Sequence, residues 1–98
     1  MTIEKKLQGN TLEIALTGRL DTTTAPELEK EARNALTGIT NLIIDLAELE
    51  YISSAGLRVL LSMQKIMSKQ GEMVVRGATE AVREVFDITG FSSILTLE

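Results

Sequence analysis

Two adjacent serines, Ser53 and Ser54, stand where an apolar segment gives way to the start of a predicted helix. A serine hydroxyl at this position can accept a hydrogen bond from an amide of the first turn, so one of the two is expected to cap the helix. The same free amides, together with the positive end of the helix dipole, would also stabilise a phosphate. Phosphorylation would add about −1.5 to −2 charges there. The pattern leaves two roles open, a plain N-cap and a phosphorylation site.

The residues that follow the serines bear on both roles. Gly56 lies in the first turn, where glycine costs about 1 kcal/mol relative to alanine, so the Ala55-Gly56 pair indicates a close approach by another backbone or side chain. A partner protein or the neighbouring strand could make that approach. Arg58 lies four residues after Ser54, one helical turn away, and could pair with a phosphate or with an acidic partner.

Two aspartates are further candidates. Asp21 precedes a run of three threonines, where aspartate commonly orders a loop or caps a helix, and an exposed loop can also carry binding residues. Asp45 ends an apolar segment, and a lone carboxylate there favours structural hydrogen bonding over a magnesium site, which would draw on further carboxylates. The sequence therefore predicts neither a metal site nor a cofactor.

Composition disfavours most enzyme classes. The chain has no histidine and no cysteine, so Ser54 lacks the usual general base and there is no thiolate nucleophile. A net charge of −4 argues against nucleic acid as a partner. No segment resembles a membrane span or a signal peptide, which predicts a cytoplasmic protein. We expect a binding protein with no catalytic residues.

Helices and strands alternate along the chain after an initial hairpin, and they must position these residues. A charged edge strand and a second strand should pair through the turn at residues 8–10, and a capping box at Thr24 to Glu27 should open the first helix, which Gly38 ends. The remaining signals are an apolar strand at 42–46, a helix from Ser53 or Ser54 to Gly71, a strand at 73–75, a helix from Thr79 to Gly90 and a strand at 94–97. This order, β-β-α-β-α-β-α-β, predicts one α/β domain over residues 1–98, with parallel strands in a mixed sheet and helices packed on it.

Five segments, taken in order, are similar to the STAS domain family and in particular to bacterial anti-sigma-factor antagonists. They are Leu16-Thr17-Gly18-Arg19-Leu20-Asp21, Leu42-Ile43-Ile44-Asp45-Leu46, Tyr51-Ile52-Ser53-Ser54-Ala55-Gly56-Leu57-Arg58-Val59-Leu60-Leu61, Gly71-Glu72-Met73-Val74-Val75 and Val85-Phe86-Asp87-Ile88-Thr89-Gly90-Phe91. Each is modestly specific, but together they cover essentially the whole chain.

The resemblance implies a phosphorylation switch. In such antagonists a serine at this helix start is phosphorylated by an anti-sigma factor that is also a kinase. The unphosphorylated form binds that kinase and frees a sigma factor, and a PP2C-type phosphatase reverses the modification. The phosphorylated position falls on Ser54. Ser53 stands where many members carry aspartate, which makes it a second candidate acceptor, and Ala55 replaces a hydroxyl residue.

The resemblance also implies a partner-binding surface that includes the loop after the Leu16-Thr17-Gly18 segment. The expected partner-binding residues are Asp21, Ser53, Ser54, Ala55, Gly56 and Arg58. An alternative function within the same family is that of a soluble STAS subunit in a larger assembly, such as a lipid-transport ATPase complex. The sequence does not predict an oligomeric state.

Overall fold

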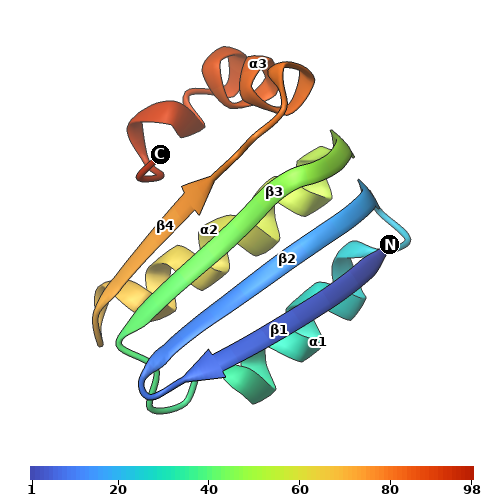
Figure 1. Ribbon diagram of the computed structural model, residues 1–98. Coiled ribbons are helices and arrows are strands. Elements are labelled where there is room, and N and C mark those ends of the chain that lie inside the picture. Colours follow the sequence, from blue (N-terminus) through green and yellow to red (C-terminus); the bar gives the residue numbers. More distant parts are fainter.

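A computed structural model describes residues 1–98 and places four strands in one sheet, in the order β1-β2-β3-β4 (Figure 1). β1 and β2 form the predicted antiparallel hairpin, and β2 with β3 and β3 with β4 are the predicted parallel pairs. The strands are β1 (Thr2–Gln8), β2 (Thr11–Leu20), β3 (Asn41–Ile52) and β4 (Glu72–Arg76). The helices are α1 (Ala25–Ala35), α2 (Ser54–Ser68) and α3 (Glu80–Thr89), followed by a short 3₁₀ turn, η1 (Phe91–Ser93). The expected α/β fold with a mixed sheet is confirmed.

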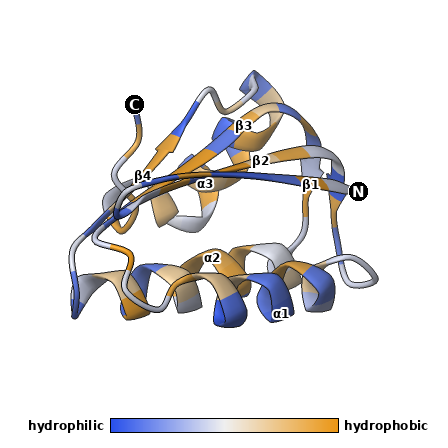
Figure 2. Cartoon of the chain, turned by 60° about the horizontal axis from the view of Figure 1, so that its bottom comes forward, coloured by the Kyte–Doolittle hydropathy of each residue, from blue (hydrophilic) through white to orange (hydrophobic).

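The helices cover the sheet unequally. α1 and α2 lie side by side on one face (Figure 2), while α3 packs against β3 near the end of the chain (Figure 1). Thr79 caps α3 as predicted, and its hydroxyl also donates to the Leu49 carbonyl at 3.1 Å, which ties α3 to β3. None of the helices is long and apolar enough to cross a membrane.

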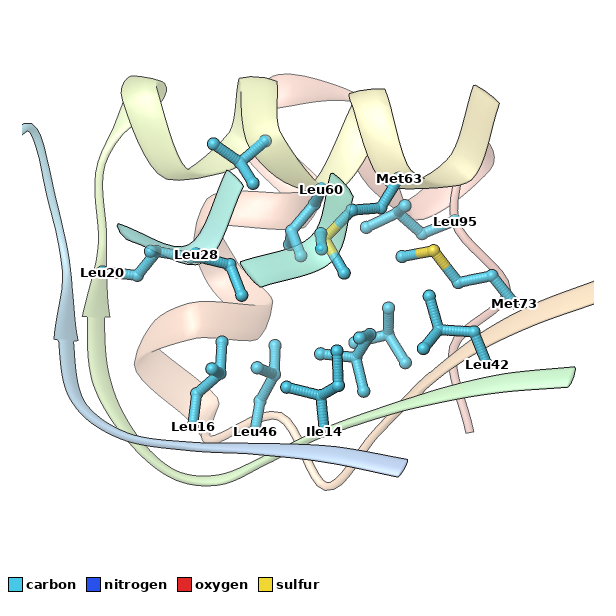
Figure 3. Packing of buried hydrophobic residues seen from close by; sticks show 14 of the residues in the cluster. Ile14, Leu16, Leu20, Leu28, Leu42, Leu46, Leu60, Met63, Met73 and Leu95 are labelled. Atoms are coloured by element: carbon cyan, nitrogen blue, oxygen red, sulfur yellow. The ribbon is translucent and has the colours of Figure 1, made fainter. Parts of the chain in front are cut away.

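The core lies between the sheet and its helices. Alternate residues point inward from Leu12 to Leu16 on β2 and from Leu42 to Leu46 on β3, and leucines and methionines from α1 and α2 meet them there (Figure 3). The cluster has 24 buried hydrophobic residues, and no polar or charged residue is buried. The open face of the sheet instead carries an ionic cluster in which the Arg76 guanidinium contacts Glu13 on β2 at 2.7 Å and Asp45 on β3 at 3.9 Å.

Three local expectations were wrong. The capping box at Thr24 does not form, because the Thr24 hydroxyl accepts from the Asp21 amide and donates to the Arg19 carbonyl instead of capping α1. The expected strand at 94–97 is reduced to a single parallel bridge between Val75 and Leu97, and η1 with its C-cap ends only at Ile94. β3 runs to Ile52, well beyond the predicted end at Leu46.

Candidate functional site

The carboxyl ends of β2 and β3 position the start of α2. The Ser53 amide donates to the Leu20 carbonyl at the end of β2, with N and O 2.9 Å apart. Ser53 keeps an extended backbone as the N-cap of α2, and its Oγ accepts from the Gly56 amide at 3.4 Å. The structure thus assigns the cap, which the sequence left open between two serines, to half-buried Ser53.

Ser54 occupies the first position inside α2. Its side chain is exposed, and its hydroxyl makes no hydrogen bond within the chain. The first turn of α2 carries no acidic residue, so nothing negative competes for its free amides. An exposed hydroxyl at a positive helix end is open to chemical modification, whereas the neighbouring Ser53 hydroxyl is committed to the cap.

Gly56 is explained by packing within the molecule. A Cβ added to this residue would lie 2.7 Å from Leu20 Cγ and 2.8 Å from Ile52 Cγ1, closer than side-chain carbons pack. Gly56 is itself buried. Of the two explanations that the sequence left open, close approach to the neighbouring strands therefore accounts for this glycine without a partner.

Asp21 orders the loop that leads from β2 into α1. Its Oδ1 accepts from the Thr23 hydroxyl at 2.7 Å and from the Thr23 and Thr24 amides at 3.0 and 3.2 Å. These hydrogen bonds, above all the one from the Thr23 hydroxyl, hold the pKa of the Asp21 carboxyl below its ordinary value although partial desolvation opposes them. Oδ2 lies 3.7 Å from Arg19 Nε. The loop-ordering role proposed from sequence is present, and a role in partner binding stays a prediction.

Arg19 in turn stacks on the ring of Tyr51, with its guanidinium carbon 4.2 Å from the ring centroid. The two residues are paired neighbours on β2 and β3. Tyr51 is 40% exposed and immediately precedes the apolar end of β3, so the stack lies close in sequence to the start of α2. A cation above an aromatic face is worth about 0.5–1 kcal/mol at an exposed position.

A groove of about 290 Å³ lies beside the start of α2. The loop after Asp21 and the first turns of α1 form its other side. Its lining residues are Thr22, Ala25, Pro26, Glu29, Ala55, Arg58 and Val59. Arg58, on the rim, is exposed and forms no ion pair. The α1 side of the groove was not predicted, since no local pattern in the sequence indicates which face of α1 will lie beside α2.

Asp45, the remaining candidate, lies away from this site. Asp45 Oδ1 accepts from the Ala47 amide at 3.0 Å, and its Oδ2 lies 3.9 Å from Arg76 Nε on the open face of the sheet. The predicted structural role of Asp45 is confirmed. Asp21, Ser53, Ser54, Ala55 and Arg58 belong to the two segments that meet at the groove and the start of α2, with Gly56 beneath them.

Comparison with known proteins establishes the family. The model of the STAS domain matches residues 2–98, so the chain belongs to the STAS domain family. The resemblance found in the sequence is thereby confirmed.

Three relatives show how proteins of this kind are named. A Bordetella bronchiseptica protein, provisionally named anti-sigma factor antagonist BtrV, is 44% identical over 81 residues, which cover 81% of this chain and 70% of that protein. An anti-sigma-B factor antagonist of Listeria monocytogenes is 32% identical over 89% of this chain and 78% of its own. The crystal structure of an anti-sigma factor antagonist from Mycobacterium paratuberculosis matches with a TM-score of 0.89 at 25% identity, covering 98% of this chain and 83% of that one.

Proposed function

We propose that this protein is an anti-sigma-factor antagonist controlled by phosphorylation of Ser54. The unmodified form binds an anti-sigma factor that is also a serine kinase, and this binding releases a sigma factor. Phosphate on Ser54 weakens the complex, and a PP2C-type phosphatase restores binding. The relatives that are named anti-sigma factor antagonists support the class of partner.

One observation carries the choice of acceptor. The Ser54 hydroxyl is exposed and unengaged at the first position of α2, whereas Ser53 Oγ is half-buried and accepts from the Gly56 amide. A kinase must bring the acceptor oxygen in line with a phosphoryl group. The Ser54 hydroxyl can be placed in this way without breaking a hydrogen bond, whereas the Ser53 hydroxyl cannot. Phosphorylating Ser53 would disturb the hydrogen bond from the Gly56 amide to Ser53 Oγ.

The switch is electrostatic and steric. Ser54 and Ala55 present small side chains beside the groove, to which a partner can approach closely. A phosphate at Ser54 adds a bulky dianion that the partner would have to desolvate or repel. No rearrangement of the fold is required, because the phosphate meets free amides at the helix end.

Incubation with a candidate anti-sigma factor kinase and ATP, followed by phosphosite mapping by mass spectrometry, tests the acceptor. We expect phosphate on Ser54 in the wild type and in Ser53→Ala, and none in Ser54→Ala. Ser53→Ala is the matched control, because it should cost about 1 kcal/mol of stability through loss of the cap while leaving the acceptor in place.

Calorimetric titration with the same kinase tests the consequence for binding. Ser54→Ala should bind like the unphosphorylated wild type, and Ser54→Asp should bind roughly tenfold more weakly, a change of about 1.4 kcal/mol. Phosphate on neither serine, or equal affinities of the wild type and both Ser54 variants, would overturn the proposal. Recovery of an ATPase and a permease as the bound partners would point to the alternative assembly role.

A further inference from the structure

The groove beside Ser54 combines an apolar wall with one unbalanced charge. Ala25, Ala55 and Val59 supply apolar lining from both helices. Two charged residues line the groove, Glu29 from α1 and Arg58 from α2. The Glu29 carboxylate already accepts from Arg33, with the two atoms 3.1 Å apart, so its charge is compensated within α1.

Arg58 is the uncompensated charge. It is exposed and forms no ion pair with any residue of the chain, and the carboxylate of the adjoining loop, Asp21, is engaged by Arg19 and the threonine donors. A partner that buries this groove must either supply a carboxylate to Arg58 or leave a guanidinium without a counter-charge. The second arrangement is unfavourable, because the desolvated guanidinium loses its hydration and gains no counter-charge. Charge complementarity therefore favours an acidic segment of the partner.

The helix also places Arg58 within reach of Ser54. Residues four apart lie on the same helix face, and a long side chain leans towards the turn on its N-terminal side. A long side chain at position 58 can therefore reach the first turn of α2, where Ser54 stands. An arginine in this position can form a bidentate pair with a phosphate.

We infer that Arg58 has two alternative partners: an acidic side chain of the anti-sigma factor when Ser54 is unmodified, and the phosphate when Ser54 is phosphorylated. In the unmodified state a segment with an aliphatic side chain next to a carboxylate occupies the groove. In the phosphorylated state the phosphate removes Arg58 from that contact as well as repelling the incoming carboxylate. This inference rests on the proposed function, and it adds the chemistry of the partner segment and the residue that couples phosphate to binding.

The pairing with phosphate can be tested without any partner. Phosphoserine is incorporated at position 54 by codon expansion, and its second ionisation is followed by ³¹P NMR as the pH is varied. Because Arg58 favours the dianion, Arg58→Gln should raise the second pKa of the phosphoserine by about 0.2–0.4 units, as expected for an ion pair one turn apart. Arg83→Gln, which removes an exposed arginine from α3, is the matched control and should leave this pKa unchanged.

The pairing with the partner is tested by calorimetric titration of the anti-sigma factor into the unphosphorylated and phosphoserine forms. In the unphosphorylated form Arg58→Gln should weaken binding roughly tenfold, Arg58→Lys should recover part of the loss, and Arg83→Gln should stay within twofold of the wild type. Phosphate should also weaken binding by a smaller factor in Arg58→Gln than in the wild type, because part of the effect of phosphate acts through Arg58.

The outcomes separate this inference from the proposed function. If the anti-sigma factor binds and phosphorylates the wild type but Arg58→Gln matches it in affinity and in the phosphate effect, the inference is overturned and the proposed function stands. An unchanged phosphoserine pKa in Arg58→Gln overturns the pairing with phosphate. If no anti-sigma factor binds the wild type, the proposed function and the acidic partner fail together, and the NMR titration alone decides the phosphate pair.

Discussion

At the scale of single residues, Asp21 and Ser53 make hydrogen bonds that order the backbone around the candidate site. Asp21 Oδ1 accepts from the Thr23 hydroxyl and from the Thr23 and Thr24 amides, which fixes the loop that forms one side of the groove. Ser53 accepts the amide of Gly56 and leaves the Ser54 hydroxyl without a partner.

The lowered pKa of Asp21 makes part of the stability dependent on pH. The folded state favours the carboxylate, so the contribution of Asp21 is fully present above the unfolded value of about 3.8. As the pH falls, the unfolded chain takes up the proton first, and the contribution is lost until the pH passes below the lowered folded pKa. Asp21→Asn should therefore reduce the melting temperature at neutral pH, and its difference from the wild type should shrink on acidification through this window.

Thermal melts monitored by circular dichroism between neutral pH and about pH 3 measure this difference. The matched control is Glu50→Gln, because Glu50 is an exposed carboxylate on β3 that makes no ion pair and no hydrogen bond in the structure. A melting-temperature difference for Asp21→Asn that stays constant across the range, or that matches the control, would contradict the role of the ionised carboxylate.

At the scale of elements, the seat of α2 on β2 and β3 depends on the missing side chain of Gly56. Glycine to alanine inside a helix normally gains about 1 kcal/mol. Here the added Cβ would meet Leu20 and Ile52 at 2.7–2.8 Å, so we expect Gly56→Ala to lose about 1–3 kcal/mol instead. Urea unfolding measures the change. Ala55→Gly at the adjacent position is the control and should cost no more than about 1 kcal/mol, and a stabilised Gly56→Ala would show that α2 can shift without penalty.

The two ends of α3 were predictable because their signals are local. Thr79 and Gly90 bracket α3 as a hydroxyl N-cap and a left-handed C-cap, and both signals are visible in the sequence. The end of β3 was not predictable, since two irregularities in its pairing with β2 break the alternation of buried residues. Its last buried residues, Leu46, Leu49 and Ile52, are spaced by three and do not resemble a strand.

Part of the candidate site was also predictable from local patterns, and part was not. A serine pair at a helix start is a local pattern, so its position could be predicted, but which serine caps the helix depends on where the backbone leaves β3. The groove could not be predicted, because Ala25 and Glu29 come from α1 and meet α2 only after both helices pack on the sheet. Thr24 shows the opposite failure: it fits a capping box, but its hydroxyl makes other bonds with the preceding loop.

At the scale of the whole molecule, one hydrophobic cluster joins every layer. The cluster includes residues of β2, β3, β4 and all three helices, and Leu95 extends it beyond η1 towards the end of the chain. A single core of this kind is expected to unfold in one cooperative step. The segment at 94–97 is no regular strand, so its attachment depends on the buried Leu95 and on the bridge at Val75.

This arrangement predicts that a change near the end of the chain affects the entire fold. Leu95 is 4% exposed and its neighbour Ile94 is 47% exposed, so Leu95→Ala should cost about 2–5 kcal/mol and Ile94→Ala about 0.5 kcal/mol or less. Urea unfolding is followed by circular dichroism and by the fluorescence of Tyr51, the one tyrosine in a chain without tryptophan. Both signals should shift together in Leu95→Ala, because Tyr51 lies on β3, whose inner residues share the core with Leu95. A shift in circular dichroism alone would mean that the last segment detaches separately, and equal losses for the two variants would mean that burial of Leu95 contributes nothing to stability.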